Sequence, residues 1–424
     1  MSVSVAAGNR LRDHLRALAR GVQRVARDPR TRDLAAIGPQ TAVFLAGVWA
    51  RNRRDEVDEV AASAARLSPG LAAQVLIDHA LIAGLKDPRL LPRLEDYGTA
   101  AAEVAQAEDL YRRQGWLDDP ASYHRAPPRP EWYVIDRRRA FDVRYEHVQF
   151  RSGFEPRPSE PGHDRWMAHE ANGTMHAWVL RHRNGPRPWI VCIHGFGMGV
   201  PFLDLRAFRA MQLFRQGLNV VAPVLPLHGP RSDSGVRGEG FMTINLVDSV
   251  HGLTQAAWDV RRVIRWLRVD HEAHRIGLFG ISLGGYVAAL VASLESKLQC
   301  VITGIPFVDL PGLYRRHSPA RVGRRARQCG ALGEAADTVH RVVSPFAMDP
   351  LVPADGRFIF AGLGDRMSTY GQARRLWLHW GQPEFACYGG GHVGFYWSGA
   401  VNRFVADALT ASRLLPSRAP ATSR

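Results

Sequence analysis

The chain has 424 residues, of which 46% are hydrophobic and 22% are charged, a composition typical of a soluble globular protein with a sizeable core. Its formal net charge is +15, and almost all of the basic residues are arginine. These arginines are scattered, without a nucleic-acid-binding motif or interleaved aromatic residues, so we expect no nucleic-acid partner.

The cysteines and the N-terminus indicate the compartment. None of the four cysteines belongs to a CxxC pair, which predicts free thiols in a reducing environment. Met1 to Arg20 lack the apolar core and small-residue cleavage site of a signal peptide, so we expect a cytoplasmic protein. The most apolar early stretch, Leu34 to Ala50, is shorter than the roughly 20 residues that span a membrane. It also contains Pro39, so we expect a buried helix there.

Residues 1–119 are expected to be helical, because apolar residues recur there at helical spacing. Within them, residues 8–27 predict a basic amphipathic helix, with most of its arginines off the apolar stripe. Such a helix could give the protein a peripheral contact with a membrane or dock it on a partner. The alternative is a helix that packs on its own domain and exposes a solvated basic face, which the lack of Trp and Phe on the stripe favours.

The chain divides at a proline-rich stretch. Three prolines within four residues disfavour helix and favour extended backbone, so residues 120–132 are expected to be a linker. Residues 133–415 follow as the second domain, and residues 416–424 are expected to be a disordered tail.

The second domain begins with two strand-like stretches, Phe141 to Phe150 and Trp166 to His182. Asn172-Gly173 inside the second stretch predicts a hairpin turn. The rest alternates short apolar strands with helices. This pattern predicts an α/β fold with a mostly parallel, doubly wound sheet covered by helices on both faces, preceded by an all-helical region.

A nucleophile motif lies within this alternation. Gly280-Ile281-Ser282-Leu283-Gly284 follows an apolar strand and precedes an apolar helix, the context that gives G-x-S-x-G its meaning. The glycines permit a sharp turn that would present the Ser282 hydroxyl at the carboxyl edge of the sheet. The helix N-terminus behind it favours developing negative charge. The alternative is a glycine-rich turn with a surface serine.

A serine nucleophile requires a base and an acid that orients the base. His392 is the candidate base, because it ends a run of glycines directly after an apolar strand. Asp365 is the candidate acid, since it follows another strand and a glycine-containing turn. Asp309 is the second candidate for the acid, and either aspartate could instead be a helix cap.

The tetrahedral intermediate requires backbone N–H donors for its oxyanion. One is expected from Leu283, the residue after the nucleophile. The second is expected from Phe196, or from Gly197, in the loop that begins at His194 after an earlier strand. A phosphate-binding loop is disfavoured because no lysine follows and the spacing matches neither nucleotide motif. A flexible turn is the remaining alternative.

These motifs resemble the α/β-hydrolase superfamily over residues 140–415, in its order of oxyanion loop, serine, acid and histidine. The resemblance implies that Ser282, Asp365 and His392 form a catalytic triad that cleaves small-molecule carboxylic esters, in the manner of an esterase, lipase or thioesterase. It implies an acyl-enzyme and neither a metal nor an organic cofactor. An acyltransferase with the same triad is one alternative. A peripheral membrane or scaffold protein on a hydrolase fold is another. No motif predicts an oligomeric state.

Further residues bear on the substrate. His194 in the oxyanion loop, and His228 and Arg231 in the loop after the next strand, are the candidate substrate-binding residues. A structural turn is the alternative for the second loop. Residues 310–352 occupy the place of a cap insertion and are rich in arginine. They could recruit a carboxylate or phosphate, or could simply form a solvated basic surface.

Overall fold

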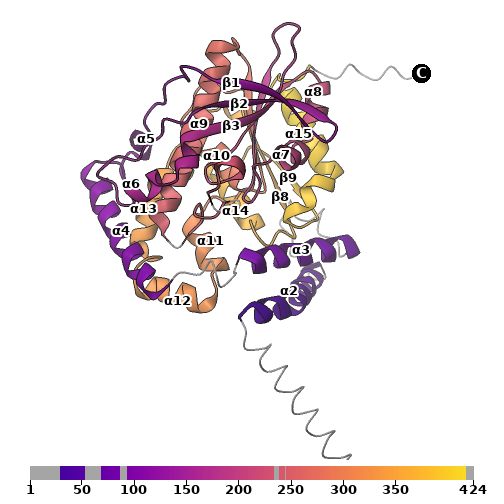
Figure 1. Ribbon diagram of the computed structural model, residues 1–424. Helices are drawn as coiled ribbons and strands as arrows, with labels where there is room; N and C mark the ends of the chain where they lie inside the picture. Colours follow the sequence, from indigo (N-terminus) through magenta and orange to yellow (C-terminus); the bar gives the residue numbers. More distant parts are fainter. Residues whose placement is uncertain (1–28, 53–67, 86–92, 234–237, 244, 417–424) are drawn as a thin grey trace, which may run out of the picture.

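A computed structural model describes residues 29–52, 68–85, 93–233, 238–243 and 245–416. Its centre is a nine-stranded sheet in the order β1-β2-β3-β5-β4-β6-β7-β8-β9 (Figure 1). In chain order its strands are β1 (Val134–Ala140), β2 (Val143–Arg151), β3 (Thr174–Leu180), β4 (Trp189–Ile193), β5 (Asn219–Pro223), β6 (Ile276–Ile281), β7 (Cys300–Gly304), β8 (Arg357–Gly362) and β9 (Glu384–Tyr388). The neighbours β1, β2, β3 and β5 pair antiparallel in succession, and the sheet from β5 to β9 is parallel.

Helices cover both faces of the sheet, as the alternating pattern predicted. One face packs against α7 (Pro201–Ala207), α8 (Ala210–Arg215) and α15 (Gly399–Ala411). The other packs against α9 (Leu246–Asp270), α10 (Leu283–Ala292), α13 (Glu334–His340) and α14 (Tyr370–His379). Strands β4, β5, β6 and β7 are buried along their whole length, because helices exclude water from both sides. The predicted α/β fold with a mostly parallel sheet is confirmed.

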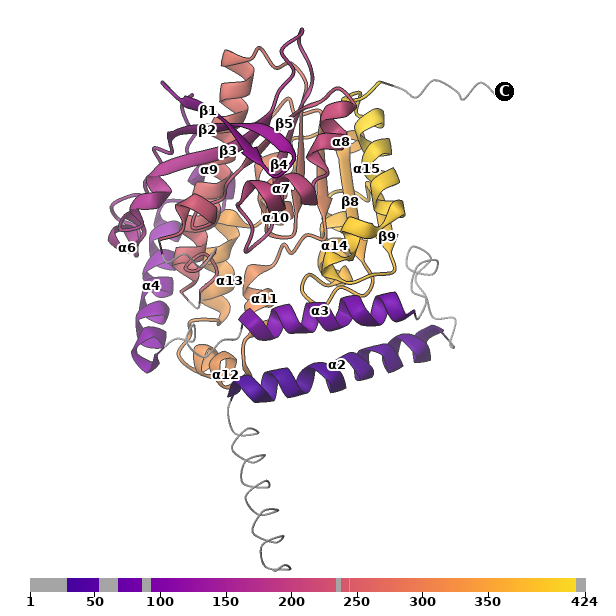
Figure 2. The same ribbon diagram turned by 45° about the vertical axis from the view of Figure 1, so that its right-hand side comes forward.

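The N-terminal helices contact the α/β domain in two places. Helices α2 (Pro29–Asn52) and α3 (Pro69–Leu85) lie side by side at the lower end of the domain, with α3 nearer the sheet (Figures 1 and 2). Helix α4 (Leu94–Arg113) packs against α9 and α13. Its buried residues Val104, Ala107 and Tyr111 belong to the same hydrophobic core as the sheet. Helix α4 therefore shares its core with the α/β domain.

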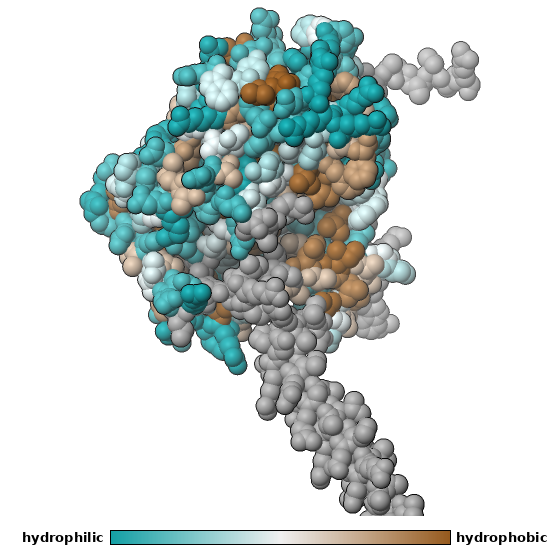
Figure 3. Space-filling view, in the orientation of Figure 1, coloured by the Kyte–Doolittle hydropathy of each residue, from teal (hydrophilic) through white to brown (hydrophobic). Residues whose placement is uncertain are grey.

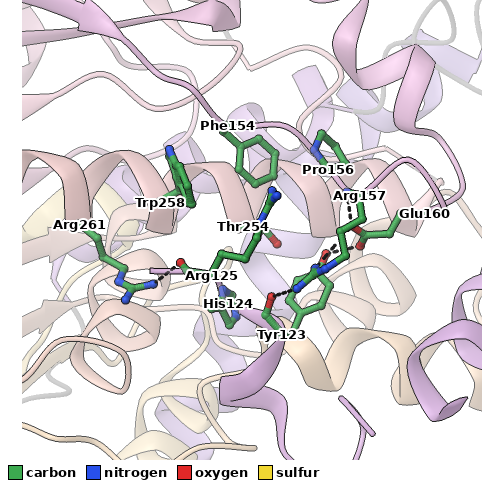
Figure 4. Close-up of a pocket in the computed structure, with 10 residues that line it drawn as sticks. All are labelled: Tyr123, His124, Arg125, Phe154, Pro156, Arg157, Glu160, Thr254, Trp258 and Arg261. Atoms are coloured by element: carbon green, nitrogen blue, oxygen red, sulfur yellow. Dashed lines mark hydrogen bonds and ion pairs between the residues drawn. The ribbon is translucent and has the colours of Figure 1, made fainter. Parts of the chain in front are cut away.

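A small pocket lies between the segment that follows α4 and helix α9 (Figure 4). The buried carboxylate of Glu160 accepts hydrogen bonds from the hydroxyls of Tyr123 at 2.7 Å and Tyr111 at 3.3 Å. The guanidinium of Arg157 lies 4.1 Å from the ring centroid of Trp116 and donates to the Tyr123 carbonyl oxygen. Through these contacts, Glu160 and Arg157 bind the segment between α4 and β1 to the α/β domain.

One sequence-based expectation is wrong in this region. The stretch from Trp166 to His182 is not a hairpin: it contains α6 (His163–Met167), the 3-10 helix η2 (Glu170–Gly173) and then β3. The Asn172 side chain accepts a hydrogen bond from Leu227 N at 2.8 Å instead of turning a hairpin. The expected linker over residues 120–132 begins with a helical turn, α5 (Pro120–Tyr123). Proline is tolerated at the first position of a helix, where its missing N–H would have no partner.

Other expectations concern chain ends, thiols and membranes. The predicted basic helix over residues 8–27 lies outside the described residues, as does the predicted tail over residues 416–424 except for its first residue. The four cysteines, which all lie within the described residues, form no disulfide, with Cys192 and Cys300 buried and the other two half-buried. Among the described helices, none combines the length and apolar character that a membrane span requires.

Most of the surface visible in Figure 3 is hydrophilic, and hydrophobic residues gather on its right-hand flank, around α15 and α3. The expected cap region, residues 310–352, is helical and contains α11 (Leu310–His317), α12 (Ala320–Gln328) and α13. Helix α12 buries Ala326 against α4 and exposes the side chains of its arginines, which are Arg321, Arg324, Arg325 and Arg327.

Candidate active site

Ser282 occupies a strained turn between β6 and α10. Its backbone angles are φ 55° and ψ −118°, a conformation that residues with a side chain rarely adopt. Neighbouring secondary structure holds the turn, because Ser282 N donates to Gly304 O at 2.9 Å and Tyr286 N donates to Ser282 O at 3.1 Å. In this strained conformation, Ser282 lies partly exposed at the carboxyl end of β6 and at the N-terminus of α10.

The glycines of the motif are required by close approach of backbone. A Cβ atom on Gly284 would overlap the carbonyl oxygen of Ile193 at the end of β4. A Cβ atom on Gly280 would overlap the carbonyl oxygen of Gly284. Only glycine lets α10 pack this tightly against β4 and β6, and this packing sets the direction of the turn.

The structure brings Ser282, His392 and Asp365 together. His392 Nε2 lies 3.0 Å from Ser282 Oγ, and His392 Nδ1 lies 2.7 Å from Asp365 Oδ2. Asp365 follows β8, and His392 follows β9 at the start of the 3-10 helix η6 (His392–Trp397). Because the strands are parallel, their carboxyl ends meet at one edge of the sheet. A neutral imidazole protonated on Nδ1 donates to the carboxylate and accepts from the serine hydroxyl.

Burial and charge set the protonation behaviour of this group. His392 is 8% exposed and Asp365 is 3% exposed. Burial alone would lower the pKa of His392, but the charge and hydrogen bond of Asp365, with the charge of Asp78, leave that pKa above its ordinary value. Asp365 Oδ1 also accepts hydrogen bonds from Met367 N and Ser368 N, both at 2.8 Å, which fixes the carboxylate.

The expected oxyanion loop runs beside the nucleophile. A Cβ atom on Gly195 would lie 3.4 Å from Ser282 Cβ, and Gly197 has φ +75° with open space at the position of a Cβ. Leu283, at the first position of α10, is buried. Phe196 and Gly197 are half-buried. The backbone of this loop and the first turn of α10 thus flank Ser282.

The three candidate substrate-binding side chains are buried in the structure, which corrects that prediction. Arg231 is 0% exposed, pairs with Asp259 at 2.8 Å and donates to the carbonyl oxygens of Val224 and Asn172. His194 accepts from Leu225 N at 3.0 Å through Nε2 and donates to Gly195 O through Nδ1.

His228 is also 0% exposed, and its Nδ1 lies 2.7 Å from Pro226 O. These side chains hold the loops around the site in place. The sequence does not distinguish such internal hydrogen-bonding residues from ligand-binding ones.

The second candidate for the acid, Asp309, is a helix cap. It accepts from Gly312 N at 2.8 Å at the start of α11 and pairs with Arg375 at 3.0 Å. These two partners hold the pKa of the Asp309 carboxyl below its ordinary value, although burial opposes them.

Sequence reasoning missed two groups of residues that support the site. Asp204 on α7 is buried, accepts from Gly199 N at 3.0 Å and from Trp178 Nε1 at 2.8 Å, and so anchors the end of the oxyanion loop. Gln74 and Asp78 on α3 contact the backbone of the loop that carries His392. The single carboxylate within the mostly apolar sequence of α3 was the signal available for Asp78, because buried polar residues are the informative ones.

No cluster of three or more His, Cys, Asp or Glu side chains suited to a metal ion occurs in the described ranges. The reactive groups that the structure gathers at the carboxyl edge of the sheet are the Ser282 hydroxyl, the His392 imidazole and the Asp365 carboxylate.

The strand order, with β4 between β5 and β6, and the strained serine turn between β6 and α10 are those of one fold. The chain has the α/β-hydrolase fold. It belongs to the same family as two proteins of Mycobacterium tuberculosis, Uncharacterized protein Rv2627c of strain H37Rv and Uncharacterized protein MT2702 of strain CDC 1551. Each is 42% identical over 397 residues, which covers 92% of this chain and 93% of the relative.

No protein-family model matches the chain. Among solved structures, it is similar to the acetyl xylan esterase from Paenibacillus sp. R4, with a TM-score of 0.49 and 17% identity over 70% of this chain and 93% of that chain. It is also similar to acetyl xylan esterase 1 from Thermoanaerobacterium sp. JW/SL YS485, with a TM-score of 0.46 and 15% identity over 71% of this chain and 93% of that chain.

Proposed function

We propose that this protein is a serine hydrolase that cleaves carboxylic esters of small molecules through an acyl-enzyme. The observation that carries the proposal is the continuous set of contacts from Ser282 Oγ to His392 at 3.0 Å and from His392 to Asp365 at 2.7 Å. A buried, doubly anchored carboxylate, an imidazole and a serine in a strained turn are the parts that activate a hydroxyl as a nucleophile.

In the first half-reaction, Ser282 Oγ attacks the acyl carbonyl carbon while His392 Nε2 takes the hydroxyl proton. Asp365 accepts the hydrogen bond from Nδ1 and stabilises the imidazolium that forms. The N–H groups of Leu283 and of Phe196 or Gly197 would stabilise the oxyanion, each contributing about 10²- to 10³-fold in rate. The imidazolium returns its proton to the leaving alkoxide, and the alcohol departs.

In the second half-reaction, His392 takes a proton from water, which attacks the acyl carbon of the ester on Ser282. The tetrahedral intermediate collapses, the C–O bond to Ser282 Oγ breaks, and His392 returns the proton to that oxygen. The carboxylic acid is released and the enzyme is restored. An acceptor alcohol in place of water would make the same centre an acyltransferase.

The test is a series of p-nitrophenyl esters from acetate to palmitate, with the wild-type protein and Ser282→Ala. We expect hydrolysis by the wild type, and a fall in kcat of about 10⁴-fold or more in the variant. A fluorophosphonate probe should label the wild type and leave Ser282→Ala unlabelled. Labelling that persists in Ser282→Ala would reject this nucleophile, and analysis of products formed with added alcohols would identify acyl transfer.

A further inference from the structure

Helix α3 contacts both loops that carry the proposed acid and base. The Asp78 carboxylate is 0% exposed and accepts a hydrogen bond from His392 N, which lies 2.9 Å from Oδ1 and 2.8 Å from Oδ2. Its Oδ2 also accepts from Arg366 N at 3.0 Å, directly after Asp365. A single buried carboxylate on an N-terminal helix thus binds the backbone next to both the imidazole and its carboxylate partner.

Gln74, one turn before Asp78, lies against glycines on both sides of His392. Its Oε1 accepts from Gly391 N at 2.9 Å. A Cβ atom on Gly390 or on Gly394 would overlap the same oxygen. A Cβ atom on Gly391 would lie 3.0 Å from Asp78 Oδ2 and from the backbone of Gln74. The loop is rich in glycine where α3 lies directly against it.

Helix α2 contacts both α3 and the loop that carries Asp365. Thr41 Oγ1 lies 2.9 Å from His79 Nδ1, and the Arg366 guanidinium lies 4.6 Å from the ring centroid of Phe44. The acid loop is therefore held between the helix pair and the sheet.

We propose that Asp78 and Gln74 are positioning residues that hold the His392 loop so that the imidazole reaches Ser282 and Asp365 together. The inference rests on the proposed function, because it assumes that His392 acts as the base. Backbone amide hydrogens at positions 391 and 392 take their acceptors from α3. Loss of those acceptors would let the imidazole drift, and a displacement of about 1 Å at such a site can cost about 10²-fold in rate.

The charge of Asp78 gives this role a measurable signature. The titratable groups that interact with its charge are Asp365, His392 and Tyr388, and Arg366 contacts it through its backbone N–H. Burial and the charge of Asp365 raise the pKa of Asp78 to about 6, against the opposing effect of His392 and the two backbone N–H groups. In turn, the charge of Asp78 helps to raise the pKa of His392.

The experiment measures the second-order rate of fluorophosphonate labelling of the full-length protein as a function of pH. In Asp78→Asn we expect labelling at the high-pH plateau to be about 10- to 100-fold slower. The midpoint of the acid limb should move to lower pH, because a negative charge that favoured imidazolium is gone. In Gln74→Ala, which removes an acceptor without a charge, we expect slower labelling with an unchanged midpoint. Asp78→Ala should be slower than Asp78→Asn, since the amide oxygen retains one acceptor.

Glu295→Gln is the matched control. Glu295 is also a buried carboxylate, but it pairs with Arg261 and Arg268 beyond the C-terminal end of α10. Replacement of its carboxylate should therefore leave the labelling rate and the midpoint of the acid limb unchanged. Wild-type rates and midpoints in both α3 variants would overturn the inference while the proposed function stands. Absence of labelling in the wild type would instead reject the proposed function. If circular dichroism shows that Asp78→Asn does not fold, the labelling rate of Gln74→Ala is the test: slower labelling supports the inference, and a wild-type rate overturns it.

Discussion

Asp365 Oδ2 and His392 Nδ1 lie 2.7 Å apart at the ends of two adjacent parallel strands. The other carboxylate oxygen of Asp365 is bound by two backbone amides of its own loop. The carboxylate therefore has one orientation available, and it selects the imidazole tautomer that leaves Nε2 as an acceptor for Ser282.

Replacement of this carboxylate by an amide tests the assignment. In Asp365→Asn, we expect kcat for p-nitrophenyl ester hydrolysis to fall by about 10⁴-fold, because an amide NH₂ beside Nδ1 favours the wrong tautomer. KM and the melting temperature should change little, since the amide oxygen can still accept from the loop. Asp309→Asn is the control, because Asp309 caps α11, and it should retain activity. A loss below tenfold in Asp365→Asn would contradict the assignment.

The pH dependence follows from the raised pKa of His392. The imidazole must be neutral to take the serine proton, so kcat/KM should rise with pH through that pKa. Because the pKa lies above its ordinary value of 6.5, the midpoint of the acid limb should lie above pH 6.5. Ester hydrolysis measured from pH 5 to pH 9 in buffers of constant ionic strength checks this. A midpoint below pH 6 would show that His392 does not act as the base in this environment.

The nucleophile turn should be intolerant of one methyl group. We expect Gly284→Ala to lower the free energy of unfolding by about 3 kcal/mol, because the new Cβ would overlap the carbonyl oxygen of Ile193, which cannot move without the strand. Gly98→Ala is the matched control, since Gly98 lies exposed within α4 with open space at its Cβ position. It should stabilise the protein by about 0.5 to 1 kcal/mol. Urea unfolding followed by circular dichroism measures both, and equal effects would contradict the packing argument.

Arg231 should matter for stability and little for substrate. In Arg231→Met, Asp259 loses its buried partner, and we expect the free energy of unfolding to fall by about 3 to 5 kcal/mol. The double variant with Asp259→Asn should recover part of this loss, because no buried charge is then left unpaired. KM of the folded protein for esters should be nearly unchanged. A large rise in KM without loss of stability would restore Arg231 as a substrate-binding residue.

The sequence predicted those features that depend on local pattern. The parallel sheet was predictable because apolar strands alternate with helices, and each residue of the Ser282, His392 and Asp365 group was a candidate because it closely follows a strand. The local pattern was insufficient where long-range contacts decide the outcome. Arg231 has the same local sequence context whether it faces a ligand or a buried aspartate on α9. Likewise Asn172-Gly173 has a hairpin signature, but the Asn172 side chain binds a distant loop instead.

The contact of α3 with the His392 loop could not have been predicted for the same reason. Asp78 and His392 are 314 positions apart, and nothing in either segment specifies the other. The glycines before His392 indicated an unusual loop. Their cause, the close packing of Gln74 and Asp78, depends on tertiary structure alone.

The docking of α3 on the histidine loop bears on how this protein can change by mutation. The His392 loop contacts a segment encoded at the opposite end of the gene, so under the proposed function a substitution among the early helices can abolish hydrolysis while Ser282, His392 and Asp365 are intact. A hydrolase that shares the sheet but has no equivalent of α3 must anchor its histidine by other means. Natural variants in residues 69–85 should therefore be assessed for lost activity in the same way as variants beside Ser282 itself.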